Sequence, residues 1–189
     1  MTQHTIVALV QDRPGVLNRI ASKWRQRGFN IESLAVGHSE QPGLSRMTFI
    51  VDGTTTDVDQ VTKQMYKIIE VVKVSDLTEH EMVHRELALV KVTATQQQRS
   101  AIIEITDVFR AKIVDVAQES LIVEVTGTED KVNAFLEMLR PYGIKEIVRT
   151  GRVAMTRGKG SPTSVDGAKG KQHRFRPAGE GKPKVGSQF

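Results

Sequence analysis

Residues 12 to 17, Asp-Arg-Pro-Gly-Val-Leu, could bind a small amino acid. They follow an apolar run and open a stretch in which apolar residues recur at helical spacing. A Pro-Gly corner between a strand and a helix exposes the first backbone N–H groups of that helix, which suit a carboxylate. Gly15 would let the carboxylate reach the amides of Val16 and Leu17. These residue types indicate a receptor for an amino acid, not a catalytic centre.

The rest of such a ligand would need polar and apolar partners. We expect Asp12 or Asn30 to bind its ammonium group. Apolar walls would come from Val16, Leu17 and Ile31. A purely structural interpretation of the corner stays open, in which Pro14 fixes φ, Gly15 permits the turn and Asp12 caps the helix.

The segment His80-Glu81-Met82-Val83-His84 matches the H-E-x-x-H pattern of zinc proteases. That chemistry needs the pattern on a long helix, so that both imidazoles face Zn²⁺ and the Glu acts as general base. Here the segment lies in a short polar stretch between two predicted strands, which favours a coincidence. A zinc hydrolase using His80, Glu81 and His84 is the alternative. We expect no catalytic residue, no metal ligand and no bound cofactor in this chain.

Apolar periodicity over residues 1–79 predicts a βαββαβ unit that would hold the amino-acid site. Its strands are expected at Thr5–Val10, Asn30–His38, Ser45–Val51 and Val71–Leu77. The first helix begins at Val16 and stops near Gly28, and Asp57 is placed to cap the second. This order is that of the ferredoxin-like split βαβ arrangement.

Residues 87–156 repeat this order. Their strands are expected at Leu87–Thr93, Lys112–Ala117, Leu121–Thr126 and Ile144–Arg149. Their helices are expected at Gln97–Phe109 and Glu129–Leu139, with Thr128 as a cap. The chain is therefore predicted to be an α+β protein of two ferredoxin-like βαββαβ modules, joined by a polar linker at residues 80–86.

Residues 157–189 are rich in Gly, Pro, Ser and Lys, which predicts a flexible, disordered basic tail. From Thr156 to the end there are eight Lys or Arg and two Asp or Glu, a charge of +6. Since the whole chain carries +5, residues 1–155 carry −1, and the folded part does not favour nucleic acid. The tail is either a solvated extension or an arm that contacts RNA or an acidic partner through Phe175.

Composition limits the setting of the protein. The absence of cysteine excludes disulfides and thiolate chemistry and fits a cytoplasmic protein. The apolar runs are far shorter than the roughly 20 residues of a membrane span, so no membrane association is expected. Each predicted sheet has an uncovered face and unpaired edges. We therefore expect a homodimer, with a sheet continuous across the two subunits.

Three sequence blocks resemble the small, regulatory subunits of acetolactate synthase (acetohydroxyacid synthase). These blocks are Asp12–Arg19, Arg27–Leu34 and Gly43–Thr48, with weaker matches at Arg85–Val92 and Glu129–Leu139. The resemblance spans about residues 4–156. The first two blocks alone indicate only an ACT-type amino-acid-binding module, whereas the third block and the second module are specific to this family.

The resemblance implies an ACT domain in residues 1–79 and a partner, the large catalytic subunit, which holds thiamine diphosphate, a divalent metal and FAD. It implies that this chain activates that subunit and confers feedback inhibition by valine or another branched-chain amino acid at an interface of two ACT domains. One copy would contribute the residues Asp12, Gly15, Val16 and Leu17, and the other Asn30 and Ile31. Asp12 departs from the family pattern, since many members have Asn there.

Overall fold

The strands of the N-terminal half form one antiparallel sheet in the order β2-β3-β1-β4. The computed structural model describes residues 3–54 and 57–159. The elements of this half are β1 (Gln3–Gln11), α1 (Val16–Arg25), β2 (Ser33–His38), β3 (Leu44–Asp52), α2 (Val58–Met65) and β4 (Val71–Asp76). The order is that of a ferredoxin-like unit, as the periodicity of the sequence predicts. Asn30 to Glu32, expected to be strand, instead precede β2.

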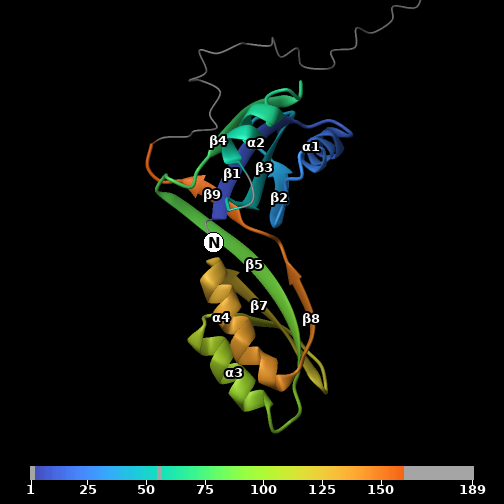
Figure 1. Cartoon of the computed structure of the whole chain (residues 1–189). Coiled ribbons are helices and arrows are strands. Elements are labelled where there is room, and N and C mark those ends of the chain that lie inside the picture. The colour runs from blue at the N-terminus through green and yellow to red at the C-terminus, as the bar shows by residue number, and fades with distance from the viewer. Residues whose placement is uncertain (1–2, 55–56, 160–189) are drawn as a thin grey trace, which may run out of the picture.

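Both helices of this half cover one face of its sheet (Figure 1). Alternate residues of β1 and β3 point toward the helices because side chains in a strand alternate between the two faces. The core on this face includes Ile6, Ala8, Met47 and Phe49 of the strands and Ile20, Trp24, Val61 and Met65 of the helices. The ring centroids of Trp24 and Phe49 are 4.8 Å apart, so the two rings pack together and hold α1 against β3.

The C-terminal half repeats the arrangement, with sheet order β6-β7-β5-β8. Its elements are β5 (Met82–Thr93), α3 (Arg99–Val108), β6 (Lys112–Val116), β7 (Ser120–Gly127), α4 (Glu129–Leu139), a 3₁₀ turn (Arg140–Tyr142), β8 (Ile144–Arg149) and β9 (Val153–Thr156). α3 and α4 pack on one face of this sheet around Phe135, Val90 and Val123. The predicted α+β class with two ferredoxin-like modules is confirmed.

Two predicted helix caps are present. The Asp57 side chain accepts a hydrogen bond from the Gln60 amide at 3.1 Å, at the start of α2. The Thr128 hydroxyl accepts one from the Lys131 amide at 3.5 Å, at the start of α4. Each cap satisfies an amide that has no acceptor within its own helix.

Residues 82–86, predicted as part of the polar linker at residues 80–86, lie in the first part of β5. The first four residues of β5 pair with β9 in an antiparallel ribbon. This ribbon lies against the N-terminal sheet on the face that the helices leave open, where Val7 packs against Leu77 and Ala154. The predicted C-terminal module therefore supplies part of the N-terminal core.

The two domains lie end to end, and β5 runs from one to the other (Figure 1). Within residues 3–54 and 57–159, no helix has the length and apolar character needed to cross a bilayer. The predicted basic tail, residues 157–189, lies outside the described residues after residue 159.

Candidate functional site

The corner between β1 and α1 has the backbone geometry that the sequence predicts. Gly15 is the N-cap of α1, with φ of +83°, and no side chain caps this helix end. The amide of Val16 donates to the carbonyl of Arg13 over 3.3 Å, a long bond that partly occupies this donor. The amides of Leu17 and Asn18 have no acceptor among the described residues. The open donors are therefore one position further along the helix than expected.

Asp12 does not cap α1, so that part of the structural interpretation is wrong. Its carboxylate lies 3.2 Å from Nδ1 of His38, the last residue of β2. Its amide donates to the carbonyl of Gly43 over 2.8 Å, in the turn before β3. Both contacts hold the corner against the same end of β2 and β3.

Asn30 and Ile31 lie beyond the opposite end of α1. They line a shallow cavity of about 390 Å³ together with Trp24 and Phe29. Because α1 has ten residues, its two ends are about 15 Å apart. One chain therefore does not bring Asn30 and Ile31 together with Gly15, Val16 and Leu17. It presents two separate half-sites, which we call the corner (Asp12 to Asn18) and the β2 entry (Asn30 and Ile31).

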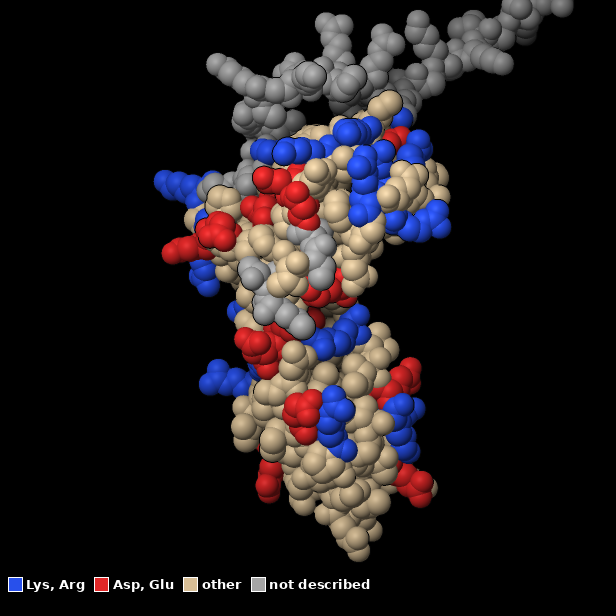
Figure 2. Space-filling view, viewed as in Figure 1, with Lys and Arg blue, Asp and Glu red and all other residues tan. Residues whose placement is uncertain are grey.

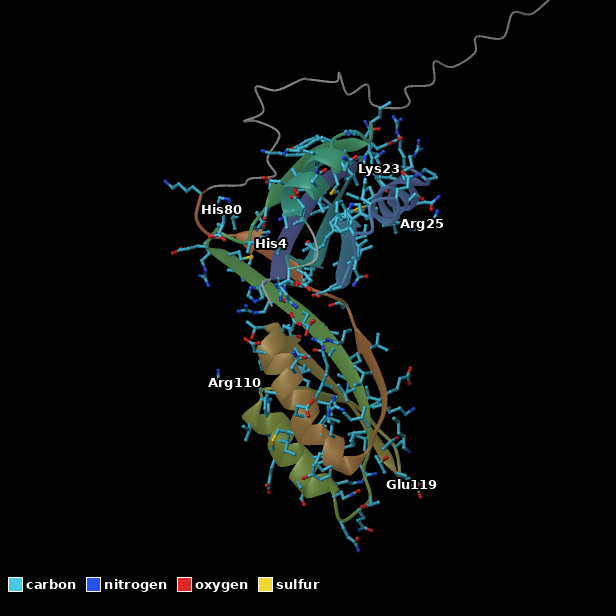
Figure 3. The ribbon with its side chains drawn as sticks, in the orientation of Figure 1. His4, Lys23, Arg25, His80, Arg110 and Glu119 are labelled. Atoms are coloured by element: carbon cyan, nitrogen blue, oxygen red, sulfur yellow. The ribbon has the colours of Figure 1, made fainter. Side chains whose placement is uncertain are left out.

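The H-E-x-x-H segment is not helical. His80 lies in the turn that precedes β5 (Figure 3), whereas His84 lies within the strand. The segment therefore lacks the helical spacing that brings both imidazoles of this pattern to one Zn²⁺. Among the described residues, no group of three or more His, Cys, Asp or Glu could hold a metal. Burial, and then the charges of Arg152 and Arg85, lower the pKa of His84 and so favour the neutral imidazole.

A polar cluster between the domains was not predicted from the sequence. Arg152, in the short connection from β8 to β9, donates to Thr5 and Gln3 of β1 and pairs with Glu129 of α4. In the sequence, Arg152 is one of several cations near the end of the second module, and nothing there indicates partners almost 150 positions away. The ribbon that positions it has no regular alternation of polar and apolar residues that would have indicated it in the sequence.

Two family models match the chain. One, described as "AHAS small subunit-like ACT domain", matches residues 6–73. The other, described as "Small subunit of acetolactate synthase", matches residues 85–158. Together these models cover both domains, and the boundary between them falls near the start of β5.

Individual relatives agree with these models. A probable acetolactate synthase small subunit of Archaeoglobus fulgidus is 56% identical over 156 residues, which are 82% of this chain and 98% of that protein. The acetolactate synthase small subunit of Mycolicibacterium smegmatis is 49% identical over 166 residues, 88% of this chain and 96% of that one. The crystal structure of the small subunit from Thermotoga maritima superposes with a TM-score of 0.77, at 42% identity, over 84% of this chain and 99% of that one.

Proposed function

Because the chain belongs to the family of acetolactate synthase small subunits, we propose that it activates the large catalytic subunit and makes it sensitive to valine or a related branched-chain amino acid. Thiamine diphosphate, a divalent metal and FAD would be held by the large subunit. This chain would bind only the effector. Its place would be the cytoplasm, in the synthesis of branched-chain amino acids.

The observation that carries the proposal is the separation of the corner from the β2 entry. Each half-site has part of what an amino acid needs. The corner offers open amides for a carboxylate, and the β2 entry offers the Asn30 amide and the apolar Ile31. A second copy of the chain would be required to bring unlike halves together.

The edge strand β2 provides a route to such a dimer. Among the strands of the described residues, β2 pairs with β3 alone and lies at the edge of its sheet. If two copies paired their β2 strands antiparallel about a twofold axis, the start of one β2 would lie beside the end of the other. The start follows the β2 entry directly, and the end, His38, contacts Asp12 of the corner. Each corner would then face the β2 entry of the other copy, giving two equivalent effector sites.

Inhibition then follows from preferential binding. Without effector, the dimer would hold the large subunit in its active state. Valine between the two copies would favour a different arrangement of the ACT domains, provided that it binds that arrangement more tightly. Typical coupling free energies of about 1–3 kcal/mol correspond to roughly 5–150-fold changes in affinity, enough for feedback control.

The test is to block the corner by Gly15→Asp. A Cβ at Gly15 meets nothing within 4 Å, and although the φ of +83° strains any side chain there, Asp tolerates a positive φ better than most residues. Its carboxylate would repel that of the effector. We expect the valine concentration for half-inhibition of acetolactate formation to rise at least about tenfold, equivalent to 1.4 kcal/mol of binding, while activation without valine persists.

Gly158→Asp is the matched control. Gly158 also has a positive φ, of +74°, and open space around its Cβ, but it lies far from the corner in the sequence. Its valine response should equal that of the unmodified chain. An unchanged valine response in Gly15→Asp would remove the corner from the effector site.

A further inference from the structure

The two domains meet through a polar seam, formed by Gln3, Thr5, Ser33, Glu129 and Arg152. The guanidinium of Arg152 donates to Thr5 Oγ1 at 3.1 Å and to Gln3 Oε1 at 2.8 Å. It also forms an ion pair with Glu129, in the first turn of α4. Since the Arg152 side chain is only 12% exposed, these bonds form away from bulk water and are stronger than surface contacts.

The backbone next to Arg152 contacts β2 directly. The Arg152 amide donates to Ser33 Oγ over 3.2 Å. Gly151, with φ of +79°, lies so close that a Cβ would come within 2.5 Å of Ser33 Oγ and 3.3 Å of the Leu34 carbonyl oxygen. Ser33 follows Ile31 of the β2 entry by two residues. A shift of the start of β2 would therefore move Arg152.

The seam is poorly filled, which lets the domains change orientation. A cavity of about 410 Å³ lies along it, lined by charged side chains that include Glu32, Glu86 and Arg149. Figure 2 shows acidic and basic side chains gathered at the narrow waist between the two lobes. Apolar contact between the domains is concentrated in the small cluster of Val7, Leu77, Met82 and Ala154. A rotation about this cluster would exchange polar bonds while losing little apolar burial.

The present arrangement of the seam is not fully satisfied. Arg152 Nε and His84 Nδ1 are buried and have no hydrogen-bond partner within the described residues. A buried polar group without a partner destabilises the arrangement that contains it. A second arrangement of the seam that gives these atoms partners would recover this loss, which favours a switch between two states.

We propose that Ser33 and Arg152 transmit effector binding from the β2 entry to the C-terminal domain. Effector between two ACT domains shifts the start of β2, Ser33 carries the shift to the Arg152 backbone, and Glu129 carries it to α4. The inference rests on the proposed function, because it needs the effector at the β2 entry. It makes Ser33 and Arg152 positioning residues that do not touch the effector.

The experiment compares Arg152→Met and Ser33→Ala with the unmodified chain, each assembled with the large subunit. Arg152→Met keeps the aliphatic stem and removes every guanidinium bond, whereas Ser33→Ala removes only the hydroxyl that accepts from the Arg152 amide. Arg85→Met is the matched control, because Arg85 lies in the same ribbon, is exposed and donates to the carbonyl of its neighbour His84. Calorimetry measures valine affinity, and acetolactate formation measures inhibition.

We expect both seam variants to bind valine within about threefold of the unmodified affinity. Maximal inhibition by bound valine should fall at least fivefold in Arg152→Met and about twofold in Ser33→Ala, and Arg85→Met should behave as the unmodified holoenzyme. Hydrogen exchange should show valine-dependent protection in α4 of the unmodified chain that Arg152→Met abolishes.

Full inhibition in both variants at unchanged affinity would overturn the coupling and leave the proposed function intact. Failure of the unmodified chain to bind valine would instead remove the proposed function, and this coupling with it. If Arg152→Met does not fold, Ser33→Ala decides the question, since loss of one hydroxyl leaves the Arg152 side-chain bonds in place.

Discussion

Asp12 is the residue whose charge most directly affects the proposed effector. Its carboxylate stands at the corner, where an incoming carboxylate is expected, and His38 lies 3.2 Å away. The His38 side chain is largely exposed, so water weakens its interaction with the Asp12 carboxylate. Asp12 would therefore both attract an ammonium group and repel a carboxylate, and the stronger effect depends on how the effector is oriented.

Asp12→Asn separates these two effects. With the effector carboxylate on the Leu17 and Asn18 amides, the variant should bind valine about two- to fivefold more tightly, from roughly 0.5–1 kcal/mol of relieved repulsion at an exposed site. The gain should shrink as salt is added, because salt screens exposed charges. Calorimetric titration at low and high ionic strength measures both. Weaker binding would mean that Asp12 holds the ammonium group instead.

At this scale, local backbone chemistry was predictable and long-range pairing was not. The Pro14-Gly15 turn and the Asp57 cap follow from residues adjacent in sequence, and both are present. The pairs of Asp12 with His38 and of Arg152 with Gln3 depend on how distant elements come together. No single-sequence pattern specifies those partners.

Among the elements, the ribbon of β5 and β9 was missed for a physical reason. Its residues alternate between an inner face, with His84 and Ala154, and an outer face, with Val83 and Arg85. Because polar and apolar residues occur on both faces, the segment lacks the period of two that marks the other strands. The helices and the central strands were predictable, because the helices bury apolar residues at helical spacing and the central strands are rich in buried apolar residues.

His84 gives this ribbon a pH dependence. Burial and the nearby cations Arg152 and Arg85 lower its pKa, although Asp130 and Glu129 act in the opposite direction. The folded chain therefore binds fewer protons than the unfolded chain as the pH falls through about 6.5, the ordinary His value. The stability associated with neutral His84 is present above that pH and is lost below it.

We accordingly expect the free energy of unfolding to fall between pH 7.5 and 5.5, and to fall less in His84→Gln, which stays neutral throughout. Urea denaturation of both proteins at the two pH values measures the difference. An equal pH dependence would show that His84 is protonated as readily in the folded chain as in the unfolded one. The other titrating groups are common to both proteins and cancel in the comparison.

At the scale of the whole molecule, the two edges of the N-terminal sheet are not equivalent in the proposed assembly. β2 would pair with a second copy, whereas β4 would stay at the outside of the eight-stranded sheet. Each edge carries an exposed valine, Val36 on β2 and Val72 on β4. A lysine on an edge strand disfavours pairing with another strand, because pairing would desolvate its charge.

Val36→Lys should weaken the dimer at least tenfold, and Val72→Lys should leave it unchanged. Sedimentation velocity over a range of protein concentrations gives both dissociation constants. If Val72→Lys produced monomers and Val36→Lys did not, the wrong edge would have been assigned to the interface. The effector would then have to bind in a different geometry.

β5 belongs to two cores at once, since its first residues shield Val7 and its later residues form the centre of the second sheet. The ACT module of this protein therefore does not complete its own core. A fragment that stops at residue 79 would expose the apolar residues around Val7, on the face of the sheet opposite the helices. The ribbon of β5 and β9 that covers them lies later in the chain. An ACT module of this kind, transferred to another protein in evolution, would have required this ribbon or a substitute for it.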